Sequence, residues 1–93
     1  MEFEWDEAKR RVNIAKHGID FVRAKEIWRG EVLEMRSSQN HHSEPRHLAY
    51  GLIGERVITV VFTRRGDNVR LISARRARQH ERQAYQDAFG RGT

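Results

Sequence analysis

The chain contains no cysteine, only one proline among its 93 residues, and no long hydrophobic run. Without cysteine it can form neither disulfides nor thiolate zinc sites, and it has no thiol nucleophile. No apolar stretch approaches the roughly 20 residues that a membrane-spanning helix needs. The acidic residues 1–6 do not resemble the basic and then apolar start of a signal peptide. These absences predict a protein of the cytoplasm that has no contact with the membrane.

The chain is instead rich in positive charge. It has 18 Lys and Arg residues against 13 Asp and Glu residues, a net charge of +5, and 15 of the 18 are arginine. The charge is uneven, because residues 1–35 sum to −1 and residues 36–93 sum to +6. Arginine offers a planar fork that holds phosphate through two hydrogen bonds. A polyanion, most simply nucleic acid, is the expected partner; enrichment in arginine for solubility is the alternative.

The length predicts a single domain over residues 1–93, with one modest core. Asp6 can cap a helix that runs to about residue 17, where Gly18 supplies a left-handed stop. Asp20 can cap a shorter helix to about residue 28. Apolar residues at helical spacing predict that the first helix has a buried stripe made of Trp5, Ala8, Val12 and Ala15.

The pattern after Gly30 predicts strands. They are expected at 31–35, 46–53, 56–63 and 69–74, followed by a helix from residue 76 to about residue 89. The third of these is dense in β-branched residues, and short turns make the strands antiparallel. The predicted fold is α+β, with two N-terminal helices, a small antiparallel sheet of about four strands, and a C-terminal helix.

Arginines surround the predicted hairpin: Arg64, Arg65, Arg70, Arg75, Arg76 and Arg78. Alternation along the strand puts Arg64 on the face of Val60 and Phe62. Arg75 lies where the last strand meets the last helix. Arginines at strand ends beside an apolar floor can hold phosphate and stabilise a phosphorane-like transition state. The alternative is a solvated charged surface with salt bridges.

Histidines gather around the loop that ends at Pro45. The spacing of His41, His42 and His47 is not that of a helical zinc site, and no carboxylate pattern accompanies it, so no metal is predicted. Glu44, Arg46 and His47 are better candidates for acid–base and electrostatic roles. His41 and His42 fit an ordinary polar loop.

Two further polar residues have both a structural and a functional interpretation. His17 ends the first helix, where a cation favours the helix dipole. Tyr85, with Arg82, lies on the last helix and can pack in the core or stack on a base, and packing is favoured. Trp5 and Trp28 have core-like spacing.

Two sets of residues form a pattern that spans nearly the whole chain. The first half contains Phe3-Glu4-Trp5-Asp6, Lys9, Asn13 and Lys16-His17-Gly18-Ile19, with Phe21 and Ala24. The second half contains Glu44, Arg46, Gly51, Val60-Val61-Phe62-Thr63-Arg64 and Arg70-Leu71-Ile72-Ser73-Ala74-Arg75, with Ala77, Glu81 and Tyr85. Together, over roughly residues 3 to 85, they resemble the BrnT toxins.

The resemblance implies a toxin of a type II toxin–antitoxin module with a fold similar to the RelE-type ribonucleases. Such toxins cleave RNA, block translation and arrest growth, and no cofactor is expected. The implied partner is a BrnA-like antitoxin, assembled with the toxin as a dimer of heterodimers. The complex would repress its own promoter, so operator DNA would be contacted only through that complex.

Cleavage of RNA without a metal requires a base for the 2′-hydroxyl, a cation for the phosphorane and an acid for the leaving 5′-oxygen. Arg64 and Arg75 are the first candidates for the cation, followed by Arg46. The candidate base is Glu44 or His47, and the candidate acid is His17 or Tyr85. The expected contacts with RNA come from Arg65, Arg70, Arg76 and Arg78. The alternative is a non-catalytic nucleic-acid-binding or regulatory module that uses the same arginines.

Overall fold

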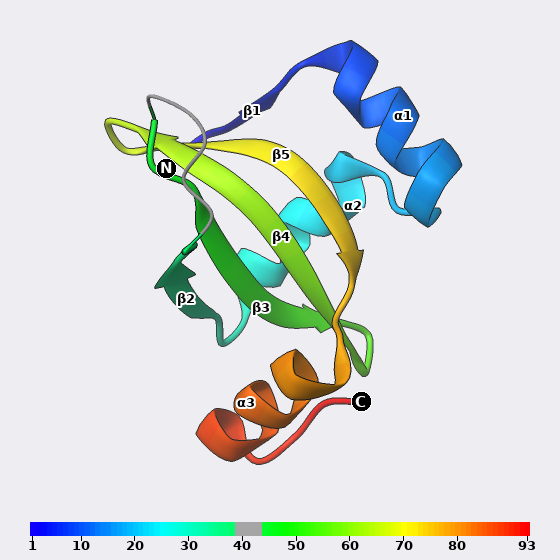
Figure 1. The fold of residues 1–93 in the computed structure, drawn as a ribbon, viewed down its shortest axis with the longest axis vertical. Helices are drawn as coiled ribbons and strands as arrows, with labels where there is room; N and C mark the ends of the chain where they lie inside the picture. The colour runs from blue at the N-terminus through cyan, green and yellow to red at the C-terminus, as the bar shows by residue number, and fades with distance from the viewer. Residues whose placement is uncertain (39–43) are drawn as a thin grey trace.

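The computed structural model describes residues 1–38 and 44–93, and it confirms the α+β class (Figure 1). The N-terminal part comprises β1 (Phe3–Trp5), α1 (Glu7–His17), α2 (Phe21–Ala24) and the 3-10 helix η1 (Lys25–Arg29). The remainder comprises β2 (Leu33–Arg36), β3 (His47–Ile53), β4 (Arg56–Arg65), β5 (Asn68–Arg76) and α3 (Gln79–Phe89). Within the described part of the chain, no helix has both the length and the hydrophobicity to cross a bilayer.

The sheet has five strands in the order β1-β5-β4-β3-β2 and is mixed. β2, β3, β4 and β5 pair antiparallel, whereas β1 runs parallel to β5 with Phe3 opposite Val69 and Trp5 opposite Leu71. The expectation of about four antiparallel strands is therefore wrong in number and in kind. β1 is three residues long and forms only by pairing with a strand far along the chain, so no local pattern predicts it.

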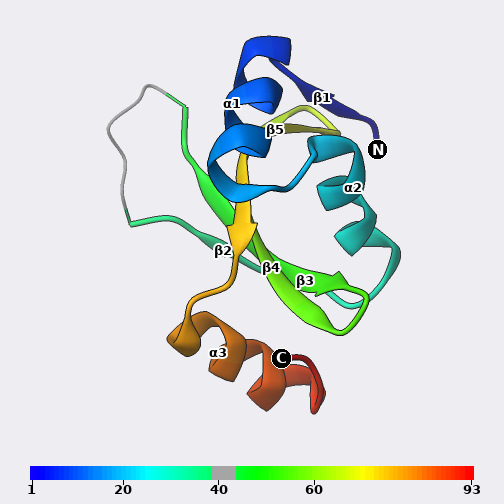
Figure 2. The ribbon, with the colours of Figure 1, turned by 90° about the vertical axis from the view of Figure 1, so that its right-hand side faces the viewer.

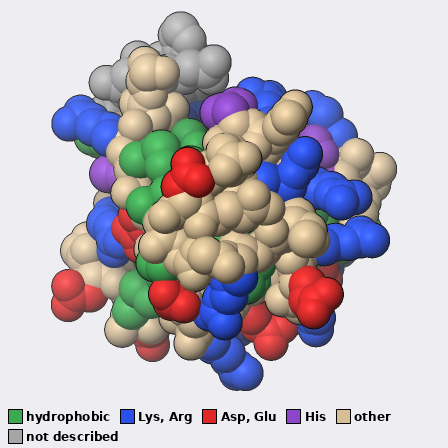
Figure 3. Space-filling view, turned by 90° about the horizontal axis from the view of Figure 1, so that it is seen from below, with side chains coloured by type: hydrophobic (Ala, Val, Ile, Leu, Met, Phe, Trp, Pro, Cys, Tyr) green, Lys and Arg blue, Asp and Glu red, His purple; other side chains and the backbone are tan. Residues whose placement is uncertain are grey.

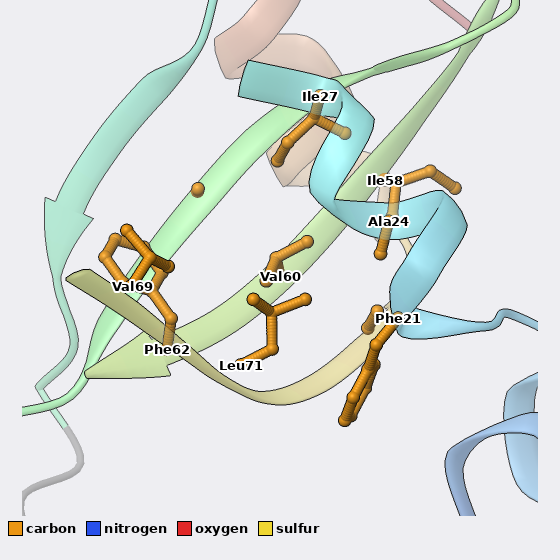
Figure 4. Close-up of a cluster of buried hydrophobic side chains, with 10 residues drawn as sticks. Phe21, Ala24, Ile27, Ile58, Val60, Phe62, Val69 and Leu71 are labelled. Atoms are coloured by element: carbon orange, nitrogen blue, oxygen red, sulfur yellow. The ribbon is translucent and has the colours of Figure 1, made fainter. Parts of the chain in front are cut away.

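One face of the sheet, called the closed face here, is covered by α2 and η1. Phe21 from α2 and Ile27 from η1 pack on Val60 and Phe62 of β4, all with at most 1% exposure (Figure 4). η1 lies close against the sheet because Gly51 of β3 has no side chain: a Cβ there would lie 2.6 Å from the Ile27 Cβ. The closed face is thus a continuous apolar core.

The opposite face, called the open face here, is covered at its ends by two of the helices that the structure describes. α3 packs at one end through Tyr85, which joins Tyr50, Val57 and Ala77 in a second buried cluster. α1 lies along β5 at the other end, and Figures 1 and 2 both show α1 and α3 far apart. The middle of the open face is therefore accessible between these helices.

α1 is held to the sheet by one buried amide and not by an apolar stripe. Val12 is 62% exposed, so the predicted burial of that stripe is wrong. Asn13 is buried instead. Its amide nitrogen donates to the backbone oxygens of Ala74 and Ile19, each at 2.8 Å, and its oxygen accepts from the Ala74 N–H at 3.0 Å. The amide thus supplies hydrogen-bond partners to the backbone of Ala74 on the edge of β5, past Leu71, where the pairing with β1 ends.

Candidate active site

A cleft of about 400 Å³ occupies the open face. Its apolar floor is formed by Leu48, Tyr50 and Val61. Its polar lining consists of Ser37, Ser38, Arg46, Ser73, Arg75, Arg78, His80 and Glu81. An apolar floor with a rim of cations is suited to a flat base attached to a phosphate.

An irregularity in β5 places two of the polar residues on this face. Val61 pairs with Ser73, but the next residue of β4, Phe62, pairs with Leu71, so Ile72 is an extra residue in β5. Strict alternation from Val69 and Leu71, which are in the core, would point Ser73 and Arg75 into the closed face. The bulge reverses the alternation, so that Ala74 enters the core and Arg75 lines the cleft.

Arg75 is anchored by a buried carboxylate. Its two terminal nitrogens donate to the two oxygens of Glu81 at 2.6 and 2.9 Å. Glu81, which is 2% exposed, also accepts from the Thr59 hydroxyl at 3.0 Å and from the Arg78 backbone N–H at 2.7 Å. In the last bond, the Glu81 side chain at the third position of α3 accepts from the backbone N–H of the N-cap residue Arg78. One side chain therefore joins β4, β5 and α3.

The ionisation of the buried groups follows from this network. Burial by itself would raise the pKa of Glu81, but the Arg75 guanidinium, the Arg78 N–H and the Thr59 hydroxyl outweigh burial and lower the pKa to about 2. Burial and the charge of Glu81 raise the pKa of Tyr50. Near neutral pH Glu81 is thus a fixed anion and Tyr50 a neutral phenol.

A second hollow of about 190 Å³ adjoins the cleft, and Arg46 lines both. The other residues of the hollow are Lys9, Glu44, Thr63, Arg65, Arg70 and Ile72. Two of its arginines are in ion pairs, Arg65 with Glu44 at 3.1 Å and Arg70 with Glu4 at 2.7 Å. The lining still has more cations than carboxylates, so positive charge extends from the cleft along the open face.

The structure brings together several residues that the sequence identifies as candidates. Arg46, Arg75 and Arg78 share the cleft, and Glu44, Arg65 and Arg70 share the neighbouring hollow. His17 lines a third hollow, which also touches Ser73. Partial burial, and then the charges of Lys16 and Arg75, lower the pKa of His17.

Other candidates lie elsewhere in the fold. Arg64 is bonded to Glu34, and its guanidinium carbon lies 5.4 Å from the centre of the Phe62 ring. His47 stacks on the same ring, so both side chains belong to the closed face. Arg76 pairs with Ile58, on the side away from the cleft. His41 and His42 are outside the described residues.

Tyr85 is fully buried, as its packing interpretation predicts. Its hydroxyl donates to the Glu31 backbone oxygen at 2.9 Å, and burial is the main reason that its pKa is raised. Trp5 and Trp28 are only half-buried at the edge of the closed-face core. These aromatic residues therefore contribute to packing.

Sequence reasoning missed His80, which is the second residue of α3 and lines the cleft beside Arg75 and Arg78. No motif marks it. Its position two residues after Arg78, in the first turn of a helix, was the only local signal. In the view of Figure 3, Lys and Arg side chains gather with His side chains toward the upper right.

The cleft charge comes from guanidinium groups. Across residues 1–38 and 44–93, no three His, Cys, Asp or Glu side chains come together in a way that could hold a metal ion. The three cleft arginines can hold an anionic substrate, and His80 places an imidazole beside them.

Comparison with known families identifies the chain. A family model described as the ribonuclease toxin, BrnT, of type II toxin–antitoxin systems matches residues 5–81. The chain belongs to the BrnT family. Membership indicates a ribonuclease toxin with RNA as substrate and an antitoxin as partner. The matched range includes every residue that lines the cleft. A search of curated proteins gives no match.

Proposed function

We propose that the open-face cleft is the active site of a metal-independent endoribonuclease. The observation that carries this proposal is the convergence of Arg46, Arg75 and Arg78 with His80 over an apolar floor. A phosphorane gathers negative charge as it forms, and fixed guanidinium groups stabilise that charge without needing to reorganise. The cleft thus offers both the cations and a proton-transfer group for cleavage of a phosphodiester.

The reaction follows from the chemistry of RNA. A base removes the proton of the 2′-hydroxyl, whose oxygen forms a bond to the adjacent phosphorus while the bond to the 5′-oxygen breaks. An acid protonates the leaving 5′-oxygen, which leaves a 2′,3′-cyclic phosphate. Arg75 is assigned to bind the non-bridging oxygens of the scissile phosphate, and Arg46 and Arg78 are assigned to support it from the same cleft. His80 is assigned to proton transfer, and Glu44 remains a candidate base at the border of the cleft.

The neighbouring hollow is assigned to the flanking nucleotides. Arg46 lines both spaces, so a strand that enters the cleft can continue toward Lys9, Arg65 and Arg70. These cations suit backbone phosphates, which are contacted regardless of base sequence. The proposal assigns no role to Arg64, His47, Arg76 and Tyr85, whose contacts are with Glu34, Phe62, Ile58 and Glu31 and not with the cleft.

The cellular role proposed for this chain follows from RNA cleavage by a single toxin domain over residues 1–93. Cutting RNA in the cytoplasm would block translation and arrest growth. A BrnA-like antitoxin would neutralise the toxin in a dimer of heterodimers. That complex would repress its own promoter and would be the only form that contacts operator DNA. Family membership supports the antitoxin and the substrate in general terms.

The test is cleavage of a defined RNA in excess EDTA, with and without translating ribosomes. We expect the parent chain to remain active in EDTA, and Arg75→Ala to lose activity by about 100-fold or more. Arg64→Ala is the matched control on the closed face and should stay within about twofold, because an exposed ion pair contributes little. His80→Gln should lose about 100-fold and remove one limb of the pH profile.

Each part of the proposal has an outcome that contradicts it. Activity abolished by EDTA would indicate a metal enzyme. Full activity of Arg75→Ala would place the site elsewhere. Salt-dependent RNA binding without strand scission under either condition would favour the non-catalytic module.

A further inference from the structure

The side chain of Glu81 is placed unusually for a carboxylate in a cleft that binds an anion. It is 2% exposed and lies among the cations that would hold RNA phosphate. Its negative charge opposes substrate binding through simple electrostatics. A carboxylate buried at such a place therefore needs a reason beyond binding.

The contacts of Glu81 supply that reason. Its two oxygens accept hydrogen bonds from the two terminal nitrogens of Arg75, at 2.6 and 2.9 Å, so the guanidinium plane is fixed in two places. Arg75 keeps 18% of its side chain exposed, on the wall of the cleft. Arginine has several rotatable bonds, and an unanchored guanidinium would sample many positions. The paired bonds restrict it to one.

The carboxylate is itself held by parts of the fold outside the cleft rim. It accepts from the Thr59 hydroxyl on β4 at 3.0 Å and from the Arg78 backbone N–H at the start of α3 at 2.7 Å. Arg75 is thus anchored to a group that has almost no freedom to move. This is the arrangement expected of a support for a preorganised charge.

We propose that Glu81 is the positioning residue of this active site: it orients the Arg75 guanidinium toward the scissile phosphate and does not itself transfer a proton. The inference rests on the proposed function. Oε1 accepts three of the four hydrogen bonds and Oε2 accepts the other from Arg75, and the carboxylate is only 2% exposed, so it is poorly placed to accept a proton from a 2′-hydroxyl. Glu81 therefore acts through Arg75.

The first test is Glu81→Gln, which keeps the shape of the side chain but presents an amide N–H₂ to one Arg75 nitrogen. We expect kcat at saturating RNA to fall about 10- to 100-fold, because a small displacement of a catalytic group has an effect of this size. Affinity for RNA should stay the same or rise, since the cleft loses a negative charge. The plateau of the pH profile should fall without loss of a limb.

The matched control is Val60→Ala, which removes buried apolar area on the closed face and removes none of the side chains that contact Glu81 or Arg75. We expect it to lower stability but to keep kcat per folded molecule within about twofold. Equal losses of kcat in both variants would show that Glu81 is only structural. Loss of a limb in the pH profile of Glu81→Gln would show that it transfers a proton, and either result overturns the inference.

A double variant shows whether the effect passes through Arg75. Glu81→Gln in an Arg75→Ala background should cause no further loss, since the group that Glu81 positions is already absent. A further loss of about tenfold would contradict the inference. If Glu81→Gln does not fold, Arg75→Lys decides the matter, because it keeps the charge but not the fork. Arg75→Lys should lose nearly as much as Arg75→Ala, and full activity would overturn the inference.

The same variants separate the two proposals. An active Arg75→Ala would refute the proposed site together with the role of Glu81. An inactive Arg75→Ala beside a fully active Glu81→Gln would refute the role of Glu81 alone.

Discussion

The closed and open faces of the sheet use the same strands for different purposes. On the closed face, α2 and η1 cover a cluster of buried apolar residues, from Phe21 to Ala74. On the open face, the same strands carry Arg75 and an apolar floor that is only partly covered, with Arg46 just before β3. Removal of apolar area from water stabilises the first face. The second face keeps its charge accessible to a ligand.

The comparison shows how a small domain can carry a concentrated positive charge. The closed face supplies most of the apolar burial, so the open face does not have to be optimised for packing. Its buried polar groups are satisfied internally: among the described residues, no buried side-chain nitrogen or oxygen lacks a hydrogen-bond partner. Most of the apolar burial and the cationic cleft therefore lie on opposite faces of one sheet, and three measurements compare how each face contributes to stability.

The largest expected difference is sensitivity to acid, which we assign to the open face. The pKa of Glu81 is about 2 in the folded protein, against 4.5 for an ordinary glutamate. Its contribution to stability is therefore complete above about pH 4.5 and is lost as the pH falls toward 2. Urea unfolding at pH 6 and near pH 2 should show that the parent loses about 3 kcal/mol more than Glu81→Gln. Equal losses would show that Glu81 does not carry the acid sensitivity.

Two adjacent valines of β4 allow the contributions of the two faces to stability to be compared directly. Val60 is fully buried in the closed face, whereas Val61 is half-buried in the cleft floor. Val60→Ala should lower the free energy of unfolding by about 2–3 kcal/mol through lost burial and the cavity left behind. Val61→Ala should lower it by about 1 kcal/mol or less, because water can fill the space. Chemical denaturation measures both, and equal losses would remove the distinction between the faces.

The smallest of the three effects concerns the attachment of α1. Asn13→Ala leaves the backbone N–H and C=O of Ala74 without the partners that the amide provides. We expect a loss of about 1–2 kcal/mol and faster hydrogen exchange at the Ala74 amide. Val12→Ala, at the exposed neighbour, should change stability by less than about 0.5 kcal/mol. An unchanged exchange rate in Asn13→Ala would mean that α1 is held by other contacts.

Local chemistry explains why much of the fold could be predicted. Asp6 and Asp20 cap α1 and α2 through side-chain bonds to backbone N–H groups, and Gly18 ends α1 with a positive φ of 72°. The β-branched residues of β4 form a strand as expected. These features depend on neighbours within a few residues, so the sequence contains the information needed to place them.

The candidate site could be predicted only in part. The sequence identified Arg46, Arg75 and Arg78 as candidates, but alternation alone would place Arg75 on the closed face, and only the bulge at Ile72 brings it to the cleft. Arg64 has the residue type and the strand position expected of a site residue, yet its side chain lies on the closed face, over the Phe62 ring. Nothing within a few residues of either arginine distinguishes them.

The sequence by itself determined the α+β class, both ends of α1, the basic C-terminal part and the family, whereas α3 begins at Gln79 and not at the expected residue 76. These depend on composition, short-range capping and a pattern of residue types. Only the tertiary structure shows that β1 pairs parallel to β5, that the Asn13 amide bonds to the Ala74 backbone on the edge of β5, and that Glu81 anchors Arg75. The physical reason is that each of these contacts except the last joins residues more than 60 positions apart. The contact between Glu81 and Arg75 depends on the bulge in β5, which sets the face of the sheet to which Arg75 points before α3 begins.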